Sequence, residues 1–197
     1  MRQAVLGLLA ATLLAGCASV HPRAQSRPTA PAATGADMAE RWSGDLSAAL
    51  SRHAARPTHA SEVGLAQAYV RAGILDKAHE HFTAAARLDP KDGSAWDGLA
   101  RIWRDWGFPA IGLGDAYRAV HAAPGSPAAH NTLGTILQLL GNGRDARAHF
   151  ERALALDPGA SYARNNLCYS WLMEAGADAA SAGCSSAPGR GETHERR

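Results

Sequence analysis

The sequence predicts an all-α protein built from repeated pairs of helices. Alanine, the strongest helix former, accounts for 44 of the 197 residues, and β-branched residues are sparse. Two sets of residues recur with a spacing of 34: Pro90, Pro124 and Pro158, and Gly73, Gly107 and Gly141. Because a fixed period of this length indicates one structural unit stacked on the next, we expect a helical solenoid.

The charge balance argues against a nucleic-acid-binding protein. The chain has 20 basic and 18 acidic residues, a net charge of +2, and its basic residues are scattered. Binding to phosphate backbones needs a clustered basic face. We therefore expect no nucleic-acid partner.

Residues 1–16 have the pattern of a signal peptide. Arg2 precedes an apolar run from Ala4 to Ala15, which is shorter than the roughly 20 residues that a membrane span needs. The segment Leu14-Ala15-Gly16-Cys17 resembles the lipobox of bacterial lipoproteins, which implies that Cys17 is lipidated. Ala18 in the following position implies sorting to the outer membrane, facing the periplasm. The alternative is an ordinary secretory signal cleaved near Ala18.

Residues 17–37 and 38–57 are predicted to be a flexible tether and a packing helix. The tether is rich in Pro, Ala and Ser and has few large apolar residues, so it cannot form a core. The segment from Met38 to Arg56 is amphipathic, with Trp42, Leu46 and Leu50 at a spacing of four. We expect this stripe to cover the apolar face of the first repeat.

The repeats are predicted at about 59–92, 93–126, 127–160 and, in part, 161–184. Two units share a long string, AHEHFTAAARLDP from Ala78 to Pro90 and ARAHFERALALDP from Ala146 to Pro158. The recurring glycines suit the left-handed turn that ends a first helix, and the Asp-Pro pairs end second helices. Each unit therefore reads as two helices.

The unit resembles the tetratricopeptide repeat (TPR). In the third unit the matching residues are Leu133, Gly134, Ala146, Phe150, Ala153 and Pro158, and the first unit repeats the pattern with Leu65, Ala66, Tyr69, Ala78, Phe82 and Ala85. The middle unit departs at Gly112 and Ala116, where we expect a shift of one residue that makes Tyr117 the aromatic plug. The resemblance implies a right-handed solenoid of about 3.5 repeats over residues 58–184, plus the N-terminal helix.

The fourth unit is degraded after Gly176 and resembles a terminal cap. In an exported protein, Cys168 and Cys184 are candidates for a disulfide joining the two helices of this unit, and two buried thiols are the alternative. The tail 185–197 is predicted to be disordered.

No residue pattern indicates catalysis or a cofactor. The nine histidines include no HExxH motif, and the chain has no CxxC, GxSxG or phosphate-binding loop. His79 and His81 are interpreted as parts of a solvated helix face, and Trp96 and Trp103 as core residues, with Trp106 the more exposed. We expect no enzyme and no metal site.

The TPR resemblance implies that partners bind in a concave groove lined by the first helix of each repeat. The predicted groove residues are mostly neutral and polar: Val63, Gln67, Val70, Arg71, Asp97, Arg101, Arg104, Asn131, Thr135, Gln138, Tyr162, Asn165, Asn166 and Tyr169. Asn and Gln side chains can pair with a peptide backbone, and Arg101 and Arg104 can meet a carboxylate.

The string Asn-Asn-Leu-Cys-Tyr from Asn165 to Tyr169, in a small TPR chain with a lipobox, is similar to the TPR lipoproteins of tight-adherence (Flp/Tad) pilus assembly. The resemblance implies an assembly factor whose partners are a secretin or other pilus components. Two alternatives remain: a pilotin-like secretin chaperone, and a cell-envelope scaffold that coordinates peptidoglycan enzymes.

Overall fold

The computed structural model describes residues 35–186, with side chains described from 44 to 174. Over this range the chain is all-α, with eight helices and no strand. The helices are α1 (Gly35–Ala55), α2 (His59–Arg71), α3 (Leu75–Leu88), α4 (Gly93–Asp105), α5 (Pro109–Ala122), α6 (Pro127–Leu139), α7 (Gly143–Leu156) and α8 (Ser161–Ser186). The signal-peptide prediction, Cys17 and the C-terminal tail lie outside the described residues.

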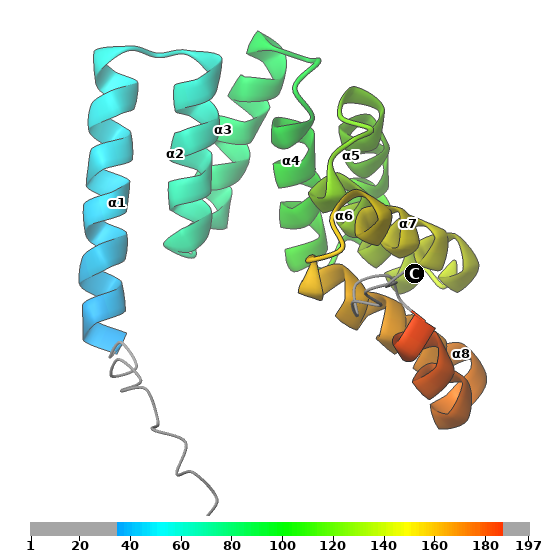
Figure 1. The fold of residues 1–197 in the computed structure, drawn as a ribbon. Helices are drawn as coiled ribbons and strands as arrows, with labels where there is room; N and C mark the ends of the chain where they lie inside the picture. The colour runs from blue at the N-terminus through cyan, green and yellow to red at the C-terminus, as the bar shows by residue number, and fades with distance from the viewer. Residues whose placement is uncertain (1–34, 187–197) are drawn as a thin grey trace, which may run out of the picture. The chain divides into compact units, whose positions relative to one another are not determined.

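Three helix pairs form the stack: α2 with α3, α4 with α5, and α6 with α7 (Figure 1). The turn within each pair contains a glycine with positive φ, namely Gly73, Gly107 and Gly141 at 74°, 84° and 83°. A side chain rarely adopts this conformation, which explains the recurring glycine. The prediction for these turns is confirmed.

The second helices end as the Asp-Pro pairs predict. Asp89 and Asp157 have extended backbones, both with φ of −139°, directly after α3 and α7. Proline disfavours helical geometry in the preceding residue. The helix pair is therefore bounded by the same residues in the first and third repeats.

Phenylalanine packs against glycine at two places in the core. A Cβ atom added to Gly98 of α4 would lie 2.4 Å from the ring of Phe82, and one added to Gly134 of α6 would lie 2.6 Å from the ring of Phe150. Both rings are buried, at 3% and 1% exposure. The missing side chain lets each ring fill the space between helices.

The middle repeat does not shift as expected. Ala116 is fully buried and Tyr117 is 50% exposed, so Tyr117 is not a plug. A Cβ on Gly112 would lie 2.9 Å from the carbonyl oxygen of Ala100. Because α4 and α5 approach this closely, no aromatic side chain is needed between them.

The helix α1 packs on the first repeat through part of the predicted stripe. Leu46 and Ala49 contact Leu65, Ala68 and Tyr69, whereas Leu50 is 43% exposed. The predicted contact of Trp42 lies outside the described side chains. Ala49, which is 2% exposed, therefore takes the place in this contact that the prediction gives to Leu50.

The fourth unit also differs from expectation, since α8 is a single helical element where two helices are predicted. No proline follows Gly176 until Pro188, and alanine is frequent between them, which favours helix over this segment. Cys168 is disulfide-bonded. Because the side chain of Cys184 lies outside the described range, the pairing of these two cysteines stays a prediction.

The predictions that Trp106 is exposed and that His79 and His81 lie on a solvated helix face are wrong. Trp106 is partly buried and lies, with Trp103, against the ring of His79, at centroid distances of 5.4 and 5.2 Å. His81 stacks on Tyr69. These two histidines therefore contact neighbouring helices rather than a solvated face.

Within the described residues, no helix is long and apolar enough to cross a membrane.

Candidate functional site

The candidate site is the inner surface formed by the first helices of the repeats. Contacts run from α2 to α4, from α4 to α6 and from α6 to α8. Among the described residues, the second helices α3, α5 and α7 make no such contacts with one another. The first helices therefore lie closer together and line the inner face, as the TPR resemblance implies.

Two adjacent hollows lie on this face and share Arg101. The first, of about 230 Å³, is lined by Gln67, Val70 and Arg71 of α2, Phe82 of α3, and Gly98, Arg101, Ile102 and Asp105 of α4. The second, of about 300 Å³, is lined by Asp97, Arg101, Arg104, Ala128, Asn131, Thr132 and Tyr162. Five predicted groove residues thus meet in the second hollow.

Asp97 is the polar centre of the second hollow. Its side chain is 13% exposed, and its Oδ1 has no hydrogen-bond partner among the described residues. Burial raises the pKa of this carboxyl, and the Thr132 hydroxyl, Arg101 and Arg104 oppose that shift. An unpaired buried oxygen costs free energy, which a bound donor recovers.

The two arginines differ in how free they are. Arg104 donates from Nε and Nη2 to Asp105 Oδ1, at 2.8 and 2.6 Å. The Nη1 of Arg101 lies 3.9 Å from Asp97 Oδ2, and the Arg101 side chain is 50% exposed. Arg101 is therefore the guanidinium that is available to a ligand.

The amide side chains of the groove join helices to one another. Asn166 Nδ2 donates to Asn131 Oδ1 at 2.9 Å, and Ser170 Oγ donates to Gln138 Oε1 at 2.7 Å. Both bonds connect α6 to α8, so these amide side chains also hold the two helices together. Because an amide oxygen can accept two hydrogen bonds, pairing of these side chains with a peptide backbone stays a prediction.

The other predicted groove residues lie outside the second hollow. Asn165 and Tyr169 are exposed on α8, and Arg71 Nε, at the edge of the first hollow, lies 3.6 Å from Asp45 Oδ2 of α1. Thr132 and Asp105 are site residues that the repeat frame misses. Each adjoins a predicted groove residue, which is the only signal that sequence offers for them.

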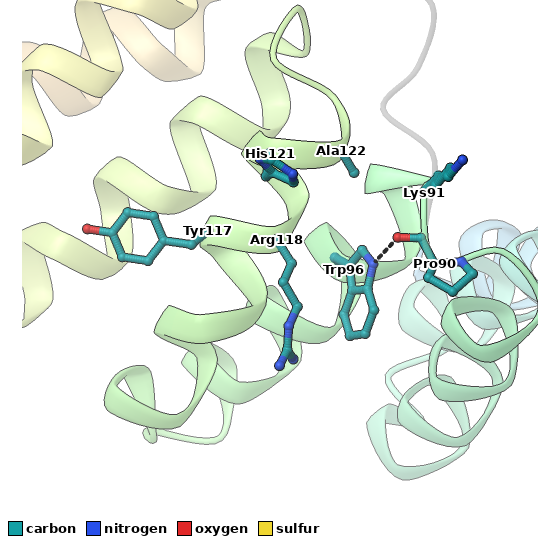
Figure 2. Close-up of a pocket in the computed structure, with 7 residues that line it drawn as sticks. All are labelled: Pro90, Lys91, Trp96, Tyr117, Arg118, His121 and Ala122. Carbon is teal, nitrogen blue, oxygen red and sulfur yellow. Dashed lines mark hydrogen bonds between the residues drawn. The ribbon is translucent and has the colours of Figure 1, made fainter.

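A larger hollow, of about 700 Å³, lies on another face, between the start of α4 and the end of α5. Trp96 Nε1 donates to the Pro90 carbonyl at 2.9 Å, and the Arg118 guanidinium lies 4.9 Å from the Trp96 ring centroid. Figure 2 shows Tyr117 and Lys91 pointing away from Trp96. Because its polar groups do not converge, this hollow is the weaker candidate.

Comparisons with known proteins agree with the repeat frame. Family models described as tetratricopeptide repeat match residues 60–102 and 127–160. A search of curated proteins found no significant sequence relative.

Three solved structures illustrate the likeness of fold. The thermophilic TPR protein TTC0263 of Thermus thermophilus is 21% identical, with a TM-score of 0.65 over 75% of this chain and 82% of its own. MamA is 18% identical, with a TM-score of 0.63 over 79% and 94% of the two chains. The first TPR of Spaghetti (RPAP3), bound to the HSP90 peptide SRMEEVD, is 21% identical, with a TM-score of 0.55 over 57% and 90%. The described chain thus has TPR repeats and the all-α TPR solenoid fold.

Proposed function

We propose that this TPR chain is a protein-interaction module, not an enzyme, that binds an extended segment of a protein partner along its inner face. The observation that carries the proposal is Asp97, which lines the second hollow and whose buried Oδ1 has no hydrogen-bond partner among the described residues. A backbone amide or an amine of the bound segment would donate to this carboxylate.

Arg101 supplies the complementary group. Its exposed guanidinium lines both hollows and would donate to a carbonyl or carboxylate of the same segment. Tyr162, 43% exposed, offers an aromatic wall beside Asp97. Donor and acceptor sites side by side suit a peptide backbone, which presents both kinds of group. The RPAP3 domain of the same fold binds a peptide, which supports this proposal by analogy.

The matched test compares two arginines. Arg101→Ala removes the guanidinium of the groove, and Arg118→Ala removes a similarly exposed guanidinium that pairs with Asp115 on α5. After crosslinking in cells, we expect Arg101→Ala to reduce partner recovery and Arg118→Ala to leave it unchanged. Equal recovery with both variants would place the binding surface elsewhere.

We also propose that the module is anchored to the outer membrane through a lipid on Cys17, facing the periplasm. The proposal rests on the lipobox-like sequence before Cys17 and on Ala18 after it. Cys17→Ser should move the protein from the membrane fraction to the soluble periplasmic fraction. A variant that stays in the membrane fraction would exclude the lipid anchor.

The pathway we propose is Flp/Tad pilus assembly, on the strength of the similar string from Asn165 to Tyr169 and the small size of the chain. Mass spectrometry of the crosslinked partners tests this directly. Recovery of a secretin or pilus-assembly component, lost in Cys17→Ser, supports it. Recovery of peptidoglycan synthases or hydrolases instead would favour the envelope scaffold.

A further inference from the structure

We propose that His53, Glu62 and His81 form a binding site for a divalent transition-metal ion of the zinc class. The three residues come from α1, α2 and α3. One ring nitrogen of each histidine and one carboxylate oxygen of Glu62 all lie within 4.8 Å of one another. The three residues are far apart in the sequence and form no short metal-binding motif. For this reason the sequence predicts no metal site here.

The ligand atoms need only small movements to surround an ion. His81 Nδ1 lies 2.7 Å from Glu62 Oε2, and His53 Nε2 lies 3.8 Å from Glu62 Oε1. Ligand atoms about 2.0–2.2 Å from a tetrahedral zinc lie about 3.3 Å from one another. Small rotations of the two imidazole rings would therefore bring the three ligands around one ion.

The hydrogen bonds of His53 turn its other nitrogen toward Glu62. The carbonyl oxygens of Arg56 and Thr58 lie 3.0 and 2.9 Å from Ser61 Oγ and take up its single hydroxyl hydrogen, so the Ser61 oxygen is left to accept. His53 Nδ1, at 3.3 Å, is then the donor to Ser61 Oγ. In the neutral ring this leaves a lone pair on Nε2 facing a carboxylate, an arrangement that a cation between them stabilises.

Charge and burial favour the same occupant. The side chains of Glu62, His53 and His81 are 12%, 24% and 22% exposed, and the described ion pairs of Glu62 involve only these two histidines. Among the described residues no Lys or Arg pairs with Glu62, so a divalent ion would supply the positive charge beside its carboxylate.

The ligand set selects the class of metal. Two imidazoles and one carboxylate suit zinc and its neighbours, whereas calcium and magnesium prefer oxygen ligands. Three protein ligands leave a fourth position for water.

The ion would join α1 to the first repeat. Apart from this cluster, the described contacts of α1 are a small apolar group around Leu46 and Ala49 and the ion pair of Asp45 with Arg71. We therefore expect metal binding to act mainly on the attachment of α1.

The test uses the full chain, purified without a histidine tag and stripped with a chelator. Isothermal titration with Zn²⁺ should give one tight site per chain, and Co²⁺ should give the absorption spectrum of a tetrahedral complex. Glu62→Gln and His53→Gln should each weaken Zn²⁺ binding by about 100-fold or more. His121→Gln, at an exposed position on α5, is the matched control and should bind as the unaltered chain does.

Hydrogen exchange gives a second readout. Zn²⁺ should slow exchange of the α1 amides in the unaltered chain and in His121→Gln but not in Glu62→Gln or His53→Gln. Circular dichroism of the metal-free variants checks that they fold. If Glu62→Gln does not fold, His53→Gln still tests the site, because His53 lies on α1, outside the core of the repeats.

Two results would overturn the proposal. One is an unaltered chain that takes up no Zn²⁺. The other is tight binding that survives His53→Gln and Glu62→Gln but is lost in His149→Gln, since His130 Nδ1 and His149 Nδ1 lie 3.0 Å apart and form a second pair of neighbouring ring nitrogens.

Discussion

A substitution of Asp97 should affect the stability of the fold and the binding of a partner in different ways. Burial raises the pKa of its carboxyl, so the folded protein carries the ionised form at a cost. Asp97→Asn keeps the shape and removes the charge. We expect a free energy of unfolding at neutral pH that is unchanged or higher, and partner binding weaker by about 1.5–3 kcal/mol, because a hydrogen bond to a charged group is lost.

Acidification should mimic this substitution. Because the pKa of Asp97 lies above its ordinary value of 3.8, the carboxyl protonates before an unperturbed aspartate does as the pH falls. Partner affinity should therefore decline through this range in the unaltered chain and stay flat in Asp97→Asn. Affinity titrations at several pH values measure both slopes, and equal slopes would remove Asp97 from the site.

His149 should make stability depend on pH. Burial, and then the neighbouring His130, lower the pKa of His149 below its ordinary value of 6.5. The unfolded chain thus binds more protons between the two pKa values, so this contribution to stability is complete above about pH 7 and declines as the pH falls through 6.5 toward the lowered pKa. Urea unfolding at a series of pH values should show a shallower loss for His149→Gln than for His121→Gln. Identical losses would contradict the assignment.

Sequence could predict the site only to the level of single positions. The repeat frame identifies Asp97, Arg101 and Tyr162, which meet in one hollow. It does not show that Arg104 is held by Asp105 or that Asn131 is held by Asn166, because these bonds depend on side-chain rotamers and on contacts between repeats. The same reason hides His53, Glu62 and His81 from a search along the chain.

Some helical glycines are needed because a neighbouring side chain or helix packs directly against them, whereas others face open space. At Gly98 a methyl group would lie 2.4 Å from the Phe82 ring, while at Gly114, on the exposed side of α5, nothing lies within 4 Å. Gly98→Ala should destabilise the protein by about 1–3 kcal/mol through overpacking. Gly114→Ala should stabilise it by about 0.5–1 kcal/mol through helix propensity. Thermal melting of both variants decides the sign, and a stabilised Gly98→Ala would contradict the described packing.

The elements that sequence predicts are those set by local chemistry. Gly73 and Asp89 determine where helices end whatever lies around them. The exposure of Tyr117 and Leu50 cannot be predicted in this way, because it depends on how the neighbouring helices pack, as the close approach at Gly112 and the burial of Ala49 show. The 34-residue period of the sequence predicts the order of the helices, whereas the distances between the helices depend on tertiary packing.

At the scale of the whole molecule, the core is divided along the stack. One buried cluster includes Phe82 and extends from α2 to α4, and another includes Phe150 and extends from α4 to α8. Contacts between helices are confined to near neighbours along the chain. In such an array stability is close to a sum of local terms, so one end can open while the other stays folded.

Two substitutions test this division. Phe82→Ala and Phe150→Ala each remove a buried ring, and each should cost about 3–5 kcal/mol because a cavity remains in a tight core. Hydrogen exchange should show where the loss falls. Phe82→Ala should speed exchange in α2 and α3 and spare α6 and α7, and Phe150→Ala should do the reverse. Uniform loss of protection in both variants would mean that the stack unfolds as one cooperative unit. In that case a partner bound near Asp97, where α4, α6 and α8 meet, would slow hydrogen exchange equally in every helix. If the core is divided, the bound partner should slow exchange most strongly from α4 to α8.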